Sequence, residues 1–216
     1  SVTKDKTWTN LYDGWKNKTD STWYKCAYPI KSLEKYSDLR YPGWNLTIPE
    51  QIRADIFIKA LHEYEAKGSF PDFTIIYLPN DHTSGYDEKS PSPRAYVADN
   101  DLATGRVVEA LSKSPFWKDM AIFVNEDDPQ SGTDHVDGHR SFCFVASPYA
   151  KRKTIISKFY NQSSVLHTIC QIFGTQPMNQ MVAMAPLMRD CFRDNPDNTA
   201  YTSLTPAIAI DEINPS

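Results

Sequence analysis

Three short apolar runs restrict the folds open to this chain. They are Phe73–Leu78, Met120–Val124 and Phe142–Ala146, and almost every side chain in them is apolar. Such runs are typical of strands that are buried on both faces of a sheet. Helical patterns separate and follow them, so that strand, helix, strand, strand and helix succeed one another. This order predicts an α/β fold in which helices cover both faces of the sheet.

Two long helices are expected between the first residues of regular structure and the second strand. The first opens at Pro49, carries Glu50 near its positive N-terminal end, and is closed by Gly68. The second runs over residues 94–112. Its inward side chains are expected to be Val97, Leu102, Val107, Val108 and Leu111.

Two further helices are expected after the last strand. One covers residues 163–173, with Ser163 or Ser164 as the N-cap and Gly174 as the stop. A short one lies within residues 180–192. The last apolar run and these helices close the α/β pattern.

The chain divides by composition into three segments. Residues 1–48 are an irregular, aromatic-rich lead-in, 49–194 the α/β core and 195–216 a C-terminal strap rich in proline. The lead-in lacks a sustained period and is expected to wrap the core. Its aromatic anchors are expected to be Trp8, Trp15, Trp23 and Trp44.

Charge and hydropathy exclude two classes of partner. The net charge of −4 and the pI of about 5.7 give no basic face for a nucleic acid. No run reaches the roughly 18 apolar residues that a membrane span requires. The chain starts at Ser1 without a leader pattern, so either a leader was removed or the chain is a fragment.

The four cysteines are widely spaced and form no C-x-x-C pair, which argues against a zinc cage of cysteines. Cys143 in a strand and Cys170 in a helix are expected to be buried free thiols. A disulfide between Cys170 and Cys191 stays open as an alternative.

Polar residues that suit metal chemistry follow two of the expected strands. Asp81 and His82 follow the first strand, and residues 126–128 (Glu-Asp-Asp) and 134–140 (Asp-His-Val-Asp-Gly-His-Arg) follow the second. Loops converge at the carboxyl ends of strands in α/β sheets. Adjacent carboxylates repel one another unless a cation or water neutralises them. Carboxylates with imidazoles suit zinc, manganese or iron, so these loops predict a metal site.

Plainer explanations exist for each group. The acids at 126–128 can be a solvated turn, and Asp81 with His82 can be a capping Asp beside an exposed His. Asp99, early in a helix, is more often a cap than a ligand. Arg94 and Arg140 can bind phosphate oxygens or pair with local carboxylates.

Several blocks together resemble one family, the phosphoesterases of the phospholipase C and acid phosphatase type, within the alkaline phosphatase superfamily. The similarity is greatest to bacterial proteins in which the phosphoesterase part follows a β-propeller. The blocks lie in order at 79–85 (PNDHTSG), 98–103 (ADNDLA), 108–119 (VEALSKSPFWKD), 122–130 (IFVNEDDPQ), 134–140 (DHVDGHR), 147–149 (SPY) and 160–169 (YNQSSVLHTI).

This resemblance implies a three-layer α/β/α sandwich and phosphate-ester hydrolysis at a divalent metal, with zinc or manganese/iron favoured over calcium. The metal ligands would be Asp81, His82, Asp127 and Asp128, joined by His135 or His139. The same histidines, His82, His135 and His139, would ligate metal or donate to phosphate oxygens during catalysis, and Arg140 would orient the loop.

One departure from the family pattern concerns the nucleophile. The family carries its Ser or Thr nucleophile and its first Glu-Asn ligands in an M-E-N-x-S-[FY]-D motif, and residues 1–48 do not match it. The chain therefore resembles the C-terminal portion of a catalytic domain whose N-terminal half would be its partner. Alone, it is expected to be inactive.

The resulting expectation is the C-terminal part of a metal-dependent phosphoesterase that acts on phosphate mono- or diesters. In the intact enzyme, a metal-activated hydroxyl would attack phosphorus and water would cleave the phosphoenzyme. The alternative is a non-catalytic, cation-binding module of a larger cell-surface or exported protein. A sulfatase or phosphomutase is a third, weaker match. The resemblance favours an exported location, periplasmic or at the cell surface.

Overall fold

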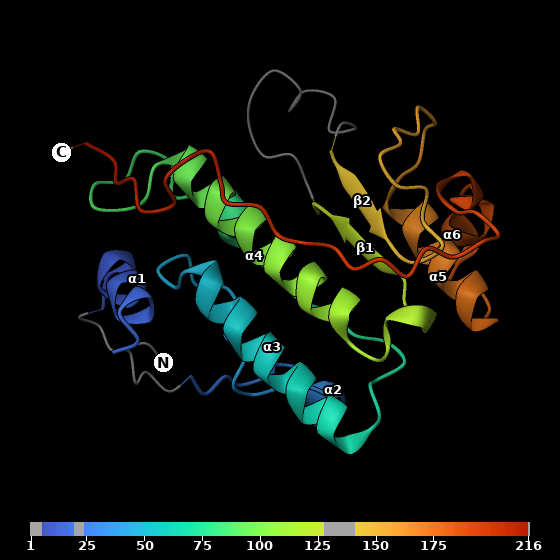
Figure 1. Cartoon of the computed structure of the whole chain (residues 1–216), viewed down its shortest axis with the longest axis horizontal. Coiled ribbons are helices and arrows are strands. Elements are labelled where there is room, and N and C mark those ends of the chain that lie inside the picture. The colour runs from blue at the N-terminus through green and yellow to red at the C-terminus, as the bar shows by residue number, and fades with distance from the viewer. Residues whose placement is uncertain (1–5, 20–23, 128–140, 216) are drawn as a thin grey trace. The chain divides into compact units, whose positions relative to one another are not determined.

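The computed structural model describes residues 6–19, 24–127 and 141–215, traced in Figure 1. The chain forms two compact units. The first comprises Ser1–Ser114 with Ala200–Ser216, and the second comprises Pro115–Thr199. Helices α1 to α4 belong to the first unit, whereas both strands belong to the second. The protein is therefore of mixed α/β class.

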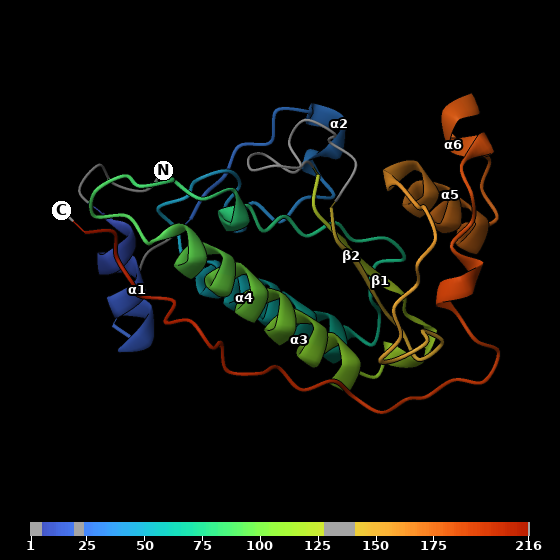
Figure 2. The same cartoon turned by 90° about the horizontal axis from the view of Figure 1, so that it is seen from above.

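Two long helices frame the first unit and confirm the sequence prediction. Helix α3 (Glu50–Lys67) follows Pro49 and ends at Gly68, whose φ of 69° lies in the left-handed region. Helix α4 (Pro93–Lys113) begins after Ser92, whose hydroxyl accepts a hydrogen bond from the helix N-terminus. The two helices lie side by side in both views (Figures 1 and 2).

The inward face of α4 differs in part from the expectation. Val107 and Leu111 are buried, and Leu102 packs against the core from a partly buried position. Val97 was expected to face inward, but it is 50% exposed. The face is set instead by Ala95, Tyr96, Ala98 and Asp99, because the buried polar residue Asp99 fixes the rotation of the first turns.

The lead-in contains a helix that its sequence did not suggest. Helix α1 (Trp8–Lys16) is capped by the Thr7 hydroxyl, which accepts from Asn10 N. Its buried residues are Trp8, Leu11 and Tyr12. This i, i+3, i+4 spacing covers barely one turn, which is too short a pattern to predict a helix. Helix α2 (Lys31–Glu34) is a single turn.

The four tryptophans of the lead-in behave differently from one another. Trp8 is buried, and Trp15 packs partly buried beside it. Trp44 is 56% exposed, so it is not the packing anchor that was expected. Trp23 lies outside the described residues.

The last residues of the chain pack on the first unit without forming a helix or a named strand. Ile213 makes an isolated bridge with Pro91, and Ile210 is buried in the cluster of Trp8 and Tyr12. Glu212 accepts from Arg94 at 2.7 and 2.5 Å. Arg94 therefore pairs with a local carboxylate, as its plainer explanation held.

The second unit contains the sheet and its covering helices. Strands β1 (Ile122–Asn125) and β2 (Cys143–Ala146) are antiparallel, with Phe123 opposite Val145. β2 lies within the predicted run Phe142–Ala146, whereas β1 overlaps the predicted run Met120–Val124 and extends one residue beyond it. The helical elements are η2 (Trp117–Asp119), α5 (Gln162–Phe173), α6 (Gln180–Met184) and η4 (Arg189–Cys191). A core of Val165, Met188 and Cys191 joins α5 and η4 to the strands.

The start of α5 corrects the predicted cap. Asn161, and not Ser163 or Ser164, is the N-cap, and its side chain accepts from Ser164 N at 3.0 Å. Ser164 reciprocates by accepting from Asn161 N at 3.2 Å, which completes a capping box. The helix ends at Gly174, as predicted.

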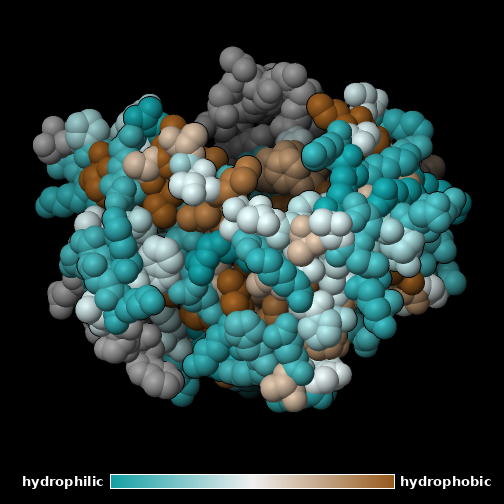
Figure 3. Space-filling model, viewed as in Figure 1, coloured by the Kyte–Doolittle hydropathy of each residue, from teal (hydrophilic) through white to brown (hydrophobic). Residues whose placement is uncertain are grey.

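The expected strand at Phe73–Leu78 is wrong for the described part of the chain. Ile75 is 79% exposed, and Phe73 and Tyr77 are about half exposed. A strand needs a neighbouring strand to satisfy its backbone groups, and β1 and β2 pair with each other. Exposed apolar side chains also occur elsewhere, and hydrophobic areas interrupt the hydrophilic face in Figure 3.

The cysteines and the helices settle two further expectations. All four cysteines are free, so Cys170 and Cys191 form no disulfide. Cys143 is exposed and Cys170 partly buried, which corrects their expected burial, and Cys191 is the buried one. Among the described residues, no helix combines the length and apolar character needed to span a membrane.

Candidate functional site

Asp81 and His82 lie in a tight turn of the first unit. The 3-10 helix η1 (Asn80–His82) carries both, and Thr83 follows with a φ of 61° and a ψ of 165°. A residue with a Cβ adopts this region at a cost in free energy, and such strain is often found at functional sites. The Thr83 hydroxyl accepts from Gly85 N at 3.1 Å and closes the turn.

The ring of His82 is exposed but held from two sides. Its Nδ1 lies 3.0 Å from the carbonyl oxygen of Thr83. Because a carbonyl only accepts, Nδ1 donates its proton there, and Nε2 of the neutral ring keeps a lone pair. The ring also packs edge to face on Trp44, with centroids 4.7 Å apart. An imidazole fixed in this tautomer suits a metal ligand.

Asn80 ties the turn to the interior of the unit. It is fully buried, whereas Asp81 is partly buried and His82 exposed. Its backbone N–H donates to Glu50 Oε1 at 2.7 Å. Its side-chain amide donates to the carbonyl of Ile48 at 3.0 Å and to Asp99 Oδ2 at 3.3 Å.

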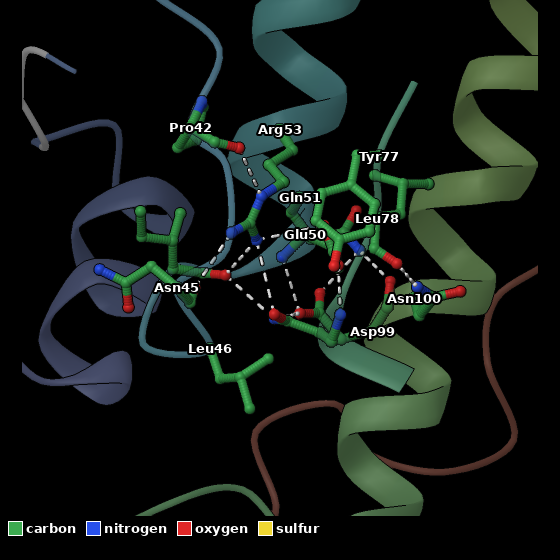
Figure 4. Close-up of polar contacts among 12 residues, drawn as sticks. Pro42, Asn45, Leu46, Glu50, Gln51, Arg53, Tyr77, Leu78, Asp99 and Asn100 are labelled. Carbon is green, nitrogen blue, oxygen red and sulfur yellow. Dashed lines mark hydrogen bonds and ion pairs between the residues drawn. The ribbon is translucent and has the colours of Figure 1, made fainter. Parts of the chain in front are cut away.

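Behind the turn lies a buried polar cluster, which is drawn in Figure 4. Its members are the fully buried side chains of Glu50, Gln51, Arg53, Asn80 and Asp99, and we call this set the Arg53 cluster. Asp99 Oδ2 accepts from Glu50 N at 2.8 Å, at the N-terminus of α3. Asp99 therefore caps the neighbouring helix α3 and not its own helix.

The charges of the Arg53 cluster do not balance. Two carboxyls, Glu50 and Asp99, share one guanidinium, with Arg53 Nη1 3.3 Å from Glu50 Oε2. Burial raises the pKa of Glu50 to about 8, although the Arg53 guanidinium and the Asn80 amide oppose it. Burial also raises the pKa of Asp99. Burial therefore favours the protonated form of Glu50.

The second unit supplies the other group of candidates. Asp127 follows β1 and is exposed, whereas Glu126 is partly buried and accepts from Ser141 Oγ at 2.8 Å. The Gln162 amide donates to the carbonyl of Glu126 at 3.2 Å and to that of Asp127. Both bonds hold the backbone of this segment.

The remaining candidates cannot be placed by the structure. Asp128, His135, His139 and Arg140 lie outside the described residues. Within residues 6–19, 24–127 and 141–215, no group of three His, Cys, Asp or Glu side chains converges as a metal site. Of the predicted ligands, the structure brings Asp81 and His82 together in one turn.

Sequence reasoning missed the residues that support this turn. Glu50 was interpreted as a complement to the helix dipole, and Arg53 and Asn80 attracted no interpretation. Two signs were available in the sequence. Glu50 and Arg53 are spaced i, i+3 on one helix face, and Asp99 lies two turns inside α4, too deep to cap it.

Comparison with known proteins gives one match. A sequence model of the Phosphoesterase family matches residues 2–176, which is more than half of the chain. Neither the curated proteins nor the solved structures include a match to this chain.

Proposed function

The chain belongs to the Phosphoesterase family, and from this premise we propose that it serves the hydrolysis of phosphate mono- or diesters at a divalent metal. The family supports a phosphoester hydrolase function with a phosphate-ester substrate. The observation that carries the metal proposal is the turn at residues 79–85. It presents an exposed imidazole whose Nδ1 proton is committed to Thr83 O, next to a carboxylate.

The residues present fit such an ion. Asp81 offers carboxylate oxygens and His82 offers Nε2, a donor set that suits zinc, manganese or iron better than calcium. Asp127 and Asp128, with His135 or His139, are the further metal ligands that we propose from the family resemblance. A bound divalent ion supplies charge that offsets the negative charge developing on phosphoryl oxygens and activates a hydroxyl for attack.

The protein's own groups would do the remaining work. His82, His135 and His139 would hold metal or donate protons to phosphate oxygens, and Arg140 would orient its loop. The attacking Ser or Thr would come from the N-terminal half of the same domain, since residues 1–48 lack the family's nucleophile motif. We extend the proposal to a three-layer α/β/α domain in the intact enzyme and to an exported location.

The rival proposal is a cation-binding module without catalysis, and the same missing motif favours it. Both proposals require a bound metal, so the first experiment measures whether the chain binds one. The chain is purified from medium with zinc and manganese, and its metals are measured beside Asp127→Asn and His82→Ala. His62→Ala is the matched control, because His62 is exposed on α3 away from the turn. We expect bound metal in the wild type and in the control, and less in the two test variants.

Activity then separates the two metal-binding proposals. Hydrolysis of p-nitrophenyl phosphate and of its bis-ester is measured for this chain and for a version extended with the preceding half-domain. Activity in the extended version alone supports the phosphoesterase. Metal without activity in either supports the binding module. If no metal co-purifies and Asp127→Asn changes nothing, the metal site is refuted.

A further inference from the structure

The Arg53 cluster places polar side chains in the interior of the first unit, where apolar side chains are usual. Five polar side chains are fully buried there, and three of them are ionisable. Buried charges lose their hydration, and well-packed apolar side chains of similar volume are often no less stable. A buried polar cluster is therefore expected where it fixes the position of neighbouring segments of the chain.

One set of hydrogen bonds in the cluster holds the turn that carries His82. The Glu50 carboxyl accepts the backbone N–H of Asn80 at 2.7 Å, and Asp99 accepts from the Asn80 amide at 3.3 Å. Helices α3 and α4 therefore both hold Asn80. The adjoining stretch is held as well, because Asn100 donates to the carbonyl of Leu78 at 2.8 Å.

A second set of hydrogen bonds holds the loop that carries Trp44. The Arg53 guanidinium donates to the carbonyls of Pro42 (3.2 Å), Gly43 (2.8 Å) and Asn45 (3.0 Å), as Figure 4 shows in part. Gly43 and Asn45 flank Trp44 on either side. The backbone of Trp44 is thus fixed by bonds from one side chain, although its ring is mostly exposed.

The loop and the turn that these two sets of hydrogen bonds hold contact each other outside the cluster, through the rings of Trp44 and His82. The His82 ring is held by Trp44 on the loop that Arg53 fixes and by Thr83 on the turn that Glu50 and Asn80 fix. Both sets of contacts would lose their alignment if the two backbones shifted relative to each other.

We propose that Glu50, Arg53 and Asn80 are positioning residues, which set the orientation and tautomer of His82 by fixing the 79–83 turn and the Trp44 loop as one body. The assignment of His82 to a metal site rests on the proposed function. The orientation of the ring does not, and this separation makes the two claims independently testable.

The test uses the full chain labelled with ¹⁵N-histidine. The ring nitrogen signals of His82 are identified because they disappear in His82→Ala. The fraction of the ring in the Nδ1–H tautomer is then measured at a pH high enough for the ring to be neutral. Zn²⁺ affinity and thermal unfolding are measured on the same samples. Glu50→Ala removes the acceptor for Asn80 N, and Glu50→Gln restores an acceptor of the same shape. Gln51→Met is the matched control, because Gln51 bonds to Asp99 and Arg106 but not to the turn or the loop.

We expect mainly Nδ1–H tautomer in the wild type, in Glu50→Gln and in Gln51→Met. In Glu50→Ala we expect a mixture near that of free histidine, with a Zn²⁺ Kd raised about tenfold or more, the scale found for residues that orient metal-ligating histidines. Should Glu50→Ala fail to fold, Asn80→Ala takes its place, since it keeps the Asn80 backbone N–H and loses only the side-chain bonds.

Two results would overturn the positioning role. One is an unchanged tautomer in the folded test variant. The other is an equal change in Gln51→Met at an equal loss of melting temperature, since a purely structural cluster would produce that. If the wild type binds no Zn²⁺ but its tautomer still depends on Glu50, the proposed function fails while the positioning role stands.

Discussion

The two groups of candidate ligands are supported in opposite ways. The turn at residues 79–85 is anchored by the buried carboxyls of Glu50 and Asp99, which accept from Asn80, and it contains a strained residue at Thr83. The segment after β1 is anchored at the surface, where Gln162 and Ser141 bond to residues 126 and 127. The first arrangement holds the His82 ring from two sides, whereas the bonds of the second hold the backbone of residues 126 and 127 and the Glu126 carboxylate. The first unit therefore supports its candidate ligands from a buried cluster, whereas the second unit supports its own from the surface.

The comparison predicts its largest effect at Arg53. Arg53→Met leaves Glu50 and Asp99 without their buried cation and removes the donors to the 42–48 carbonyls. Each buried acceptor left without a donor costs about 1–3 kcal/mol, so this variant should lose the most stability of those compared. The free energy of unfolding is measured by urea denaturation with tryptophan fluorescence.

The matched control is Arg40→Met. Arg40 pairs with Asp38 and Glu63, but its side chain is 45% exposed, so the expected loss is below about 1 kcal/mol. Equal losses in the two variants would mean that the buried cluster stabilises the first unit no more than a surface ion pair does.

A second prediction concerns the pH dependence of stability. The Glu50 carboxyl keeps its proton to about pH 8 in the folded state, compared with 4.5 as its ordinary pKa. Between these values the folded state binds more protons than the unfolded chain, so the free energy of unfolding falls as pH rises. The slope is at most about 1.4 kcal/mol per pH unit. In Glu50→Gln, this contribution to the slope disappears.

The control for the pH series is Glu63→Gln on the same helix. Arg40 lowers the pKa of Glu63, so Glu63 does not titrate across this window. The pKa of Asp99 is also raised, so in both variants the free energy of unfolding should still fall somewhat as pH rises. Parallel stability curves for the wild type and Glu50→Gln from pH 5 to 8 would contradict a protonated Glu50.

A third prediction tests whether strain is stored in the turn. Thr83→Gly removes a side chain from a φ of 61° and should raise the free energy of unfolding by about 1 kcal/mol, less the lost bond to Gly85 N. The same change should loosen His82 and lower its Nδ1–H tautomer fraction. Chemical denaturation and ¹⁵N-histidine spectra measure the two effects.

Lys89→Gly is the control for strain alone. Lys89 also has a positive φ, 65°, but it is exposed and distant in the loop from His82. It should gain stability without any change in the His82 tautomer. A Thr83→Gly protein that is less stable than the wild type would argue against stored strain.

Local patterns predicted the regular elements well and the tertiary support poorly. Pro49 and Gly68 bound α3 as expected, because proline and glycine act through their own backbone preferences. The run at Phe73–Leu78 was misassigned, because an apolar run becomes a strand only when another segment supplies its hydrogen-bond partners. That information is not local.

The same limit applies to the candidate site. Asp81 and His82 were found because polar residues after an apolar run suggest a site whatever lies beneath them. Their supports were missed, since Glu50 and Arg53 on a helix look like solvated charges until Asn80 and the carbonyls of residues 42–48 bond to them. Periodicity assigns such residues to the surface, and only contacts with segments distant in the sequence reverse that assignment.

The smallest expected effect lies in the second unit and completes the comparison. Gln162→Ala removes the amide that donates to the carbonyls of Glu126 and Asp127. Exposed hydrogen bonds contribute little, so the free energy of unfolding should fall by only about 0.5 kcal/mol. Gln171→Ala, at an exposed position of the same helix, controls for the change in helix propensity. A loss above about 2 kcal/mol, specific to Gln162, would show that this segment is held as firmly as the His82 turn. The contrast between buried and surface support would then have to be abandoned, because both segments would be held equally firmly.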